Sequence, residues 1–156
     1  MMRAILILLL GGLSPLGHAA GGGKVLFEFE PDVSNTASVQ RGARDFMNYC
    51  SGCHSLKYLR YNRLARDNAI PEELLKQNLM FTSDKPGDHI ISAMPAEDAQ
   101  QWFGQAPPDL SLTTRARGAD WVYSFLRPIP LADSTADGRD GLQLPAASMP
   151  HELGHL

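Results

Sequence analysis

Two cysteines and a histidine stand within five positions of one another near the end of the first third of the chain. They are Cys50, Cys53 and His54 in the stretch NYCSGCH, and the 156-residue chain has no other cysteine. Two thiols three positions apart can form thioether bonds with the two vinyl groups of one porphyrin, and the histidine that follows can then bind the iron. The spacing therefore predicts one covalently bound haem c, with His54 as an axial ligand.

Other uses of this motif agree less well with its surroundings. A disulfide between Cys50 and Cys53 would enclose only two residues and would constrain almost none of the unfolded chain. A thioredoxin-like dithiol does not need His54, and it follows a strand, whereas a helix is predicted before this motif. A structural zinc site needs further ligands, commonly a second cysteine or histidine pair. A thiol oxidoreductase or zinc enzyme is the alternative from another functional class.

The first twenty residues, MMRAILILLLGGLSPLGHAA, have the composition of a secretory signal peptide. Arg3 supplies the positive charge, and the apolar run at 4–10 is too short to span a bilayer. We expect residues 21–156 to form one exported, periplasmic domain. Its mildly acidic charge provides no basic surface for nucleic acid, so we expect no nucleic-acid partner.

The pattern of apolar residues predicts a mainly α fold with long irregular loops. An extended arm is expected at 24–33, followed by a helix that begins at Ser34, Asn35 or Thr36 and ends at Cys50. The apolar face of this helix is Val39, Ala43, Phe46, Met47 and Cys50.

Four shorter helices are predicted further along the chain. They cover 71–79, 95–103, 109–117 and 119–127, with Asp109 as a cap and Gly118 as a stop. An irregular loop is expected from 128 to 145, and no pairing of strands is expected. So small a helical domain needs something besides side chains to fill its centre.

A single histidine leaves the sixth position of a haem iron open, and methionine sulfur is a frequent ligand there. Of the six methionines, Met47 is expected to pack in the core. Met94 in SAMPAED and Met149 in AASMPHEL are each followed by proline, which holds the chain extended. Spacing alone does not choose between them.

The sequence HELGH at 151–155 matches the helix motif of zinc proteases, in which two histidines flank a glutamate. Such enzymes need a continuing helix and a third metal ligand, whereas Pro150 and Gly154 oppose a buried helix here. We attribute the match to coincidence.

Several segments together resemble the proteobacterial cytochrome c1 family, a subunit of the ubiquinol–cytochrome c oxidoreductase (bc1) complex. The resemblance runs from about Gln40 to Leu153. The segments are QRGARDFMNYCSGCHSLKYLRYNRL, NLMFTSDKPGD, WFGQAPPDLSLTTRARGADWVYSFLR and SMPHEL. The proline pair followed by D-L-S, together with R-A-R-G, makes the resemblance specific.

The resemblance implies a small cytochrome c-like haem domain and assigns its site. It implies that Cys50 and Cys53 carry the haem and that His54 and Met149, rather than Met94, bind the iron. Further residues implied are Arg117, at a haem propionate, and Pro108, whose carbonyl orients the His54 ring. Trp121 stands where some relatives have tyrosine, and we expect it to pack in the core.

By the same resemblance, the chain takes electrons from the Rieske iron–sulfur protein and passes them to a soluble cytochrome c. It would do so beside cytochrome b at the periplasmic face of the inner membrane, with no bond-making chemistry of its own. The loop at 128–147 lacks the aromatic and proline-rich sequence of the family, whose members continue into a C-terminal transmembrane anchor. We therefore expect either a truncated sequence or an unanchored variant, and a free periplasmic monohaem cytochrome is the alternative carrier.

Overall fold

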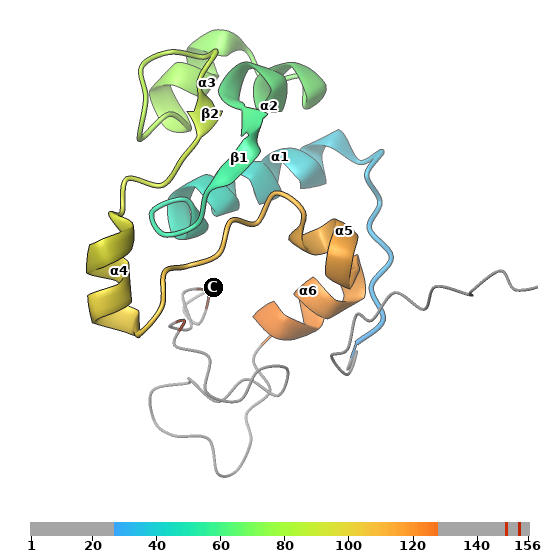
Figure 1. Ribbon diagram of the computed structural model, residues 1–156. Helices are drawn as coiled ribbons and strands as arrows, with labels where there is room; N and C mark the ends of the chain where they lie inside the picture. Colours follow the sequence, from blue (N-terminus) through green and yellow to red (C-terminus); the bar gives the residue numbers. More distant parts are fainter. Residues whose placement is uncertain (1–26, 128–148, 150–152, 154–156) are drawn as a thin grey trace, which may run out of the picture.

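The computed structural model describes residues 27–127, 149 and 153 (Figure 1). The predicted signal peptide at 1–20, the predicted loop at 128–147, and His151 and His155 of the protease-like motif lie outside these residues. Within the described part, the elements are six α-helices, one π-helical turn and two short strands. The predicted mainly α fold is confirmed.

The helix before the cysteine motif forms as predicted, but its last turn is wider than an α-helix. Helix α1 covers Thr36–Asp45, and the Asn35 side chain caps it by accepting a hydrogen bond from Ser38 N. The chain then continues as the π-helical turn η1, Phe46–Cys50. The Ser51 amide donates to the Phe46 carbonyl at 2.9 Å, which is the i→i−5 bond of a π-turn.

A two-stranded antiparallel sheet follows the motif, contrary to the expectation of no strand pairing. Strand β1 (Leu56–Arg60) pairs with β2 (His89–Ile90), with Leu56 opposite Ile90 and Arg60 opposite His89. Helix α2, Tyr61–Asp67, starts directly after β1 and was also not predicted. Both were missed because β2 has two residues and α2 begins without a side-chain cap, so neither leaves a periodic or capping signal.

The four later helices lie within the predicted ranges, and α5 is four residues shorter than predicted at its start. They are α3 (Glu72–Asn78), α4 (Ala96–Phe103), α5 (Thr113–Arg117) and α6 (Ala119–Leu126). Gly118 separates the last two with a φ of 93°, which glycine adopts without strain. The prediction of Asp109 as a helix cap was wrong, because α5 begins four residues later and the Asp109 carboxylate accepts hydrogen bonds from elsewhere.

The closed apolar core lies at the end of the molecule formed by α2 and α3, at the top of Figure 1. In this article it is called the α2–α3 core. Met47 of η1 enters it, as predicted for that methionine, and is 2% exposed. Its buried members are Met47, Tyr61, Ala65, Leu75, Leu79 and Ile90.

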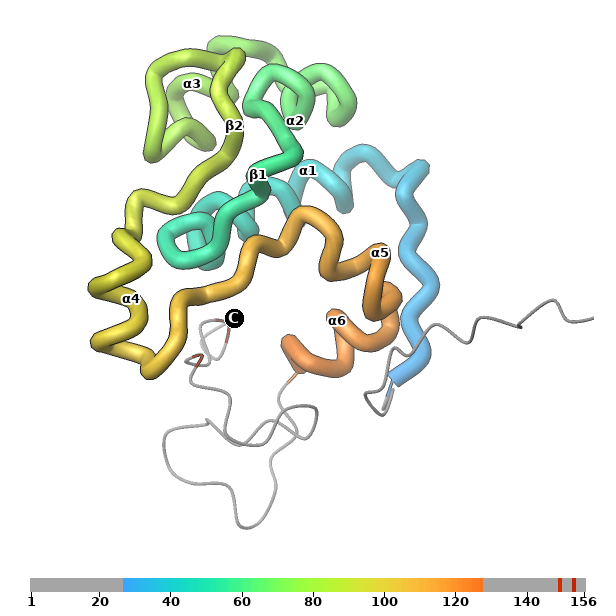
Figure 2. The backbone as a smooth tube through the Cα atoms, in the orientation of Figure 1, coloured from blue at the N-terminus to red at the C-terminus, as the bar shows by residue number. Residues whose placement is uncertain are grey.

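The chain between α4 and α5 crosses the molecule close to β1, as the tube in Figure 2 shows for residues 104–112. Helices α5 and α6 lie at the opposite end from α3. The N-terminal arm reaches α6, where Phe27 N donates to Ser124 Oγ at 3.0 Å and Phe29 N to Asp120 Oδ1 at 3.1 Å. These bonds tie the arm, which was predicted to be extended, to the last described helix.

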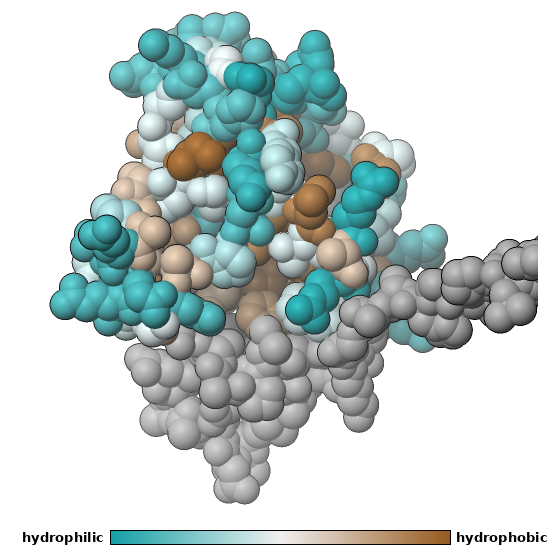
Figure 3. All heavy atoms as spheres, in the orientation of Figure 1, coloured by the Kyte–Doolittle hydropathy of each residue, from teal (hydrophilic) through white to brown (hydrophobic). Residues whose placement is uncertain are grey.

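The face shown in Figure 3 carries mostly hydrophilic side chains around the α2–α3 end. None of the helices in the described ranges combines the length and the apolar character needed to cross a lipid bilayer.

Candidate functional site

The two cysteines and the histidine of the motif are presented by one tight turn at the end of η1. Cys50 is the last residue of η1, and its carbonyl accepts hydrogen bonds from Cys53 N at 3.1 Å and His54 N at 2.8 Å. All three residues are half-buried. The buried Ser51 hydroxyl donates to the Met47 carbonyl at 2.7 Å and thereby stabilises the π-turn behind the motif.

The His54 ring is held by one backbone carbonyl. Its Nδ1 lies 2.8 Å from the carbonyl oxygen of Pro108. A carbonyl only accepts, so Nδ1 carries the proton, and Nε2 is left with a lone pair for a metal. The structure thus brings together His54 and Pro108, the pair that the sequence resemblance implied.

Four hydrogen bonds join residues 54–58 to residues 108–111, and this set is called the ligand seam. Besides the His54–Pro108 bond, Leu110 N donates to Ser55 O at 2.9 Å. The other two bonds run from Lys57 N to Asp109 Oδ2 at 2.8 Å and from Tyr58 N to Ser111 Oγ at 3.2 Å. Side chains of the crossing segment thus satisfy amides of β1.

The other side of the motif turn is held by Ser92, which sequence reasoning did not single out. Its hydroxyl donates to the Gly52 carbonyl at 2.6 Å, between the two cysteines. Its backbone N–H donates to the Ser55 hydroxyl at 2.9 Å. A lone serine 37 residues away from Ser55 leaves no pattern in the sequence, so only the fold reveals this contact.

A cavity opens beside the motif turn, with about 730 Å³ of space not filled by atoms, part of it open solvent. Its described lining residues are mostly aromatic, aliphatic, proline and sulfur-containing, and none of those described is Asp, Glu, Lys or Arg. The lining residues are Tyr49, Cys50, Cys53, His54, Phe103, Gln105, Pro107, Pro108, Leu126, Met149 and Leu153. Such a cavity suits a large apolar ring system.

The structure places the two candidate methionines differently. Met149 lines the cavity together with His54. Met94 is half-buried just before α4 and is not among the residues that line this cavity. Of the residues implied for the site, the cavity thus brings together Cys50, Cys53, His54, Pro108 and Met149.

Arg117 lies outside that lining, at the end of α5. Its guanidinium carbon is 4.9 Å from the centre of the Trp121 ring, a cation–π contact. Trp121 is buried, 7% exposed, and stacks on Phe125 at 5.3 Å, which agrees with the packing role expected for it. Its indole Nε1 is buried without a hydrogen-bond partner among the described residues. A buried donor without an acceptor is unusual in proteins and marks a place for a missing acceptor.

The Asp109 carboxylate is the charged group of the ligand seam. Partial burial raises the pKa of Asp109, but hydrogen bonds from Lys57 and Ser111, with the nearby Lys57 charge, outweigh burial and lower this pKa below its usual value of 3.8. Asp109 is therefore ionised at neutral pH, and its bonds to the backbone amides are charge-assisted.

Comparison with known proteins relates the chain to one sequence family and to several curated proteins. A sequence model of the Cytochrome C1 family matches residues 31–147. The chain is 52% identical over 138 residues to cytochrome c1 of Allochromatium vinosum, covering 88% of this chain and 57% of that protein. It is 40% identical over 157 residues to the ammonia monooxygenase gamma subunit of Nitrosomonas europaea, covering 99% of this chain and 67% of that one. Identity to the mitochondrial cytochrome c1 heme protein of Saccharomyces cerevisiae is 31% over 112 residues, covering 60% and 36% of the two chains.

Proposed function

The chain belongs to the cytochrome c1 family, and from this premise we propose that it is a one-electron carrier of a quinol–cytochrome c oxidoreductase. Members of the family carry one covalently bound haem c, whose iron supplies a reversible one-electron couple. The single observation that carries the proposal is the apolar cavity in which Cys50, Cys53, His54 and Met149 meet.

The residues at this cavity suit the haem. Cys50 and Cys53 would hold it through two thioether bonds, and His54 would bind the iron through Nε2 because Nδ1 donates to Pro108. Met149 would supply a soft thioether ligand, which raises the midpoint potential. Phe103, Leu126 and Leu153 would exclude water from the ring.

Arg117 and Trp121 would bind a haem propionate. The Arg117 guanidinium is a permanent cation, and the buried Trp121 Nε1 needs a hydrogen-bond acceptor. One propionate carboxylate can accept hydrogen bonds from both groups.

The proposed partners are cytochrome b and the Rieske iron–sulfur protein, with a soluble cytochrome c as electron acceptor. The chain spans 57% of the length of its Allochromatium vinosum relative. We propose that residues 21–156 form the haem domain of such a subunit, exported to the periplasmic face of the inner membrane behind a signal peptide at 1–20.

Haem attachment is tested by expression with a c-type maturation system. The haem should stay with the chain through acid–acetone extraction, whereas Cys50→Ala and Cys53→Ala variants should lose it or mature poorly. Haem that is extracted from the wild-type chain would contradict the proposal. Stopped-flow mixing of the loaded chain with reduced Rieske protein, and then with oxidised cytochrome c, tests the electron path.

The axial methionine is tested by two matched variants. Met149→Leu should abolish the weak near-infrared band between sulfur and iron and lower the midpoint potential, because a soft ligand of ferrous iron is lost. Met94→Leu should change neither property. The opposite result would assign the ligand to Met94.

The midpoint potential of the haem also tests the proposed contact between Arg117 and a propionate. Arg117→Leu should lower the midpoint potential, because removal of a cation near the haem favours the ferric state. Arg115→Leu, on the same short helix, is the control and should have a smaller effect. Equal effects of the two variants would show that Arg117 acts only through the overall charge.

A further inference from the structure

The carbonyl that accepts the hydrogen bond from the His54 ring belongs to Pro108. Proline has no amide hydrogen, so no bond from its own N–H can fix the peptide group that follows. The Pro108 carbonyl shares one planar peptide unit with the amide of Asp109. The direction of this carbonyl is therefore set largely by how Asp109 is held.

Asp109 is held by both of its carboxylate oxygens. Oδ2 accepts from Lys57 N at 2.8 Å, and Oδ1 accepts from Ser111 N at 3.1 Å. Lys57 is only three residues after His54, so this carboxylate links the segment of the histidine to the segment of its acceptor. In the next step along the ligand seam, Leu110 N bonds to Ser55 O at 2.9 Å.

We infer that Asp109 is a positioning residue for the iron ligand. By pinning the peptide after Pro108 to the amide of Lys57, it aims the Pro108 carbonyl at Nδ1 of His54. It thereby fixes both the orientation of the ring and the tautomer that leaves Nε2 open. This inference rests on the proposed function, because a ring that is held for metal binding matters only if His54 binds the iron.

The electrostatics of Asp109 agree with this role. Its lowered pKa keeps the carboxylate ionised at neutral pH, and charge-assisted hydrogen bonds are about twice as strong as neutral ones. An asparagine in its place keeps the shape and one acceptor oxygen but loses the charge and the second acceptor. An alanine loses both acceptors.

The role has a consequence that simple stabilisation does not have. A hydrogen bond from Nδ1 to a fixed carbonyl raises the electron-donor strength of Nε2, which favours ferric iron. If Asp109 is lost, the Pro108 carbonyl moves more freely, the bond weakens and the midpoint potential rises. The Nδ1 proton then exchanges faster with water.

The experiment uses the haem-loaded protein with the variants Asp109→Asn and Asp109→Ala. The control is Asp120→Asn. The Asp120 carboxylate also accepts a hydrogen bond from a backbone amide, Phe29 N at 3.1 Å, but Asp120 lies on α6 and outside the ligand seam. Three quantities are measured: the midpoint potential, the exchange rate of the His54 Nδ1 proton by NMR of the reduced form, and the melting temperature.

We expect Asp109→Ala to raise the midpoint potential and to speed Nδ1 exchange about tenfold or more, with Asp109→Asn between it and the wild type. The control also removes one negative charge, so it should raise the midpoint potential less than the Asp109 variants do, and it should leave Nδ1 exchange unchanged. If Asp109→Ala does not fold, the asparagine variant alone decides the matter by the same two quantities.

Two different failures can be told apart. A wild-type chain that takes up no covalent haem would contradict the proposed function, and the inference with it. Haem-loaded Asp109 variants with the midpoint potential and Nδ1 exchange rate of the wild type would contradict the inference alone, even if their melting temperature is lower.

Discussion

The two ends of this molecule are filled in different ways. At the α2–α3 end, apolar side chains pack against one another, and Tyr61 and Leu75 are fully buried. Six of the eight buried apolar residues in the described ranges belong to this α2–α3 core. The other two are Ala99 of α4 and Trp121 of α6, and between those helices lies the cavity that His54 lines.

The difference agrees with the proposal that a haem fills the cavity end. The α2–α3 end is closed by its own side chains, whereas the cavity end is built from tight turns and crossing segments held by hydrogen bonds. Such segments bury little apolar surface by themselves. A haem bound in the cavity would supply the apolar surface that the side chains there do not.

Removal of the haem should have the largest effect and should separate the two ends. In the double variant Cys50→Ser/Cys53→Ser, amides of α6 and of residues 104–111 should exchange about 100-fold faster or more than in the loaded protein, because a ligand that binds only the folded state stabilises it. Amides of α2 and α3 should stay protected. Hydrogen exchange followed by mass spectrometry measures both, and equal acceleration at the two ends would contradict the comparison.

Truncation of the α2–α3 core tests the other end. Leu75→Ala should lower the free energy of unfolding by about 2–5 kcal/mol, because it leaves a cavity in a closed core. The midpoint potential should not change. Leu74→Ala is the matched control, since Leu74 is 50% exposed on the same helix. Denaturant titration and redox titration of both variants provide the two readings, and a potential that shifts with Leu75→Ala would show that the two ends are coupled.

Detachment of the N-terminal arm should have a smaller, local effect. Ser124 is 3% exposed, and its hydroxyl accepts from Phe27 N at 3.0 Å. Ser124→Ala should lower stability by about 1–2 kcal/mol, because a partly buried amide loses its acceptor. Amides of the arm should lose protection while those of α3 keep theirs. Unchanged exchange at Phe27 would mean that the ring stack of Phe29 on Tyr123, at 4.7 Å, is enough to hold the arm.

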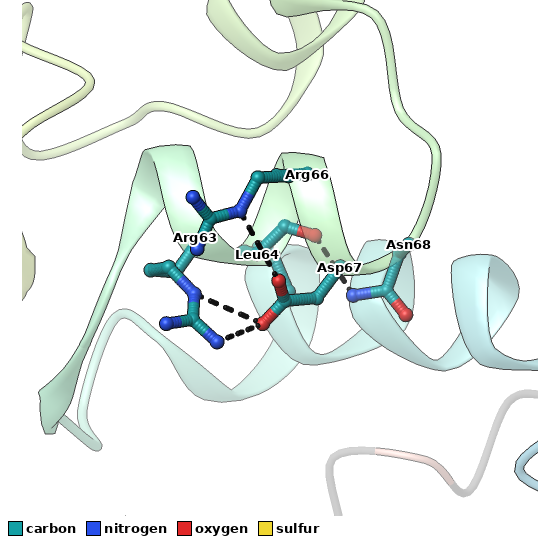
Figure 4. Close-up of polar contacts among 5 residues, drawn as sticks. All are labelled: Arg63, Leu64, Arg66, Asp67 and Asn68. Carbon is teal, nitrogen blue, oxygen red and sulfur yellow. Dashed lines mark hydrogen bonds and ion pairs between the residues drawn. The ribbon is translucent and has the colours of Figure 1, made fainter.

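The smallest effect is expected for the ion pairs on the surface of α2, shown in Figure 4. The hydrogen bond from Arg63, at 2.8 Å, is the main cause that lowers the pKa of Asp67 below 3.8. Because the folded-state pKa is the lower one, the stabilisation is present above about pH 3.8 and is lost as the pH falls through the lowered value.

Both groups are exposed, so solvent screens the pair. Asp67→Asn should therefore shift the melting temperature at pH 7 by no more than about 2 °C, and added salt should remove the difference. A calorimetric scan at two salt concentrations checks this. A larger shift would show that the α2–α3 end depends on its surface charges as well as on its core.

Sequence reasoning could predict the elements that leave a local signal. The cap at Asn35, the prolines before α3 and α4, and the stop at Gly118 each act within a few residues, and each of these helices forms. The two cysteines proposed for haem attachment also leave a local signal, because the chemistry of thioether formation requires the spacing of Cys50 and Cys53.

The contacts that support the site could not be predicted in this way. Ser92 meets Gly52 across 40 residues, and Asp109 meets Lys57 across 52. Asp109 stood before a predicted helix and was assigned to its start, the usual role of aspartate there. Its carboxylate instead accepts from the amides of Lys57 and Ser111. Lys57 belongs to β1, a strand too short and irregular to be recognised from the pattern of its own residues.

The length of chain between His54 and Pro108 also has a consequence for timing. The acceptor of the ring proton lies 54 residues after the histidine. In a chain made from its N-terminus at about 5–20 residues per second, the cysteines are complete roughly 3–10 s before the segment that aims the ring. During that interval the motif turn has neither Ser92 nor the ligand seam to restrain it. On a chain that has not yet folded, the two thiols are therefore open to haem attachment before the downstream residues close around the motif turn.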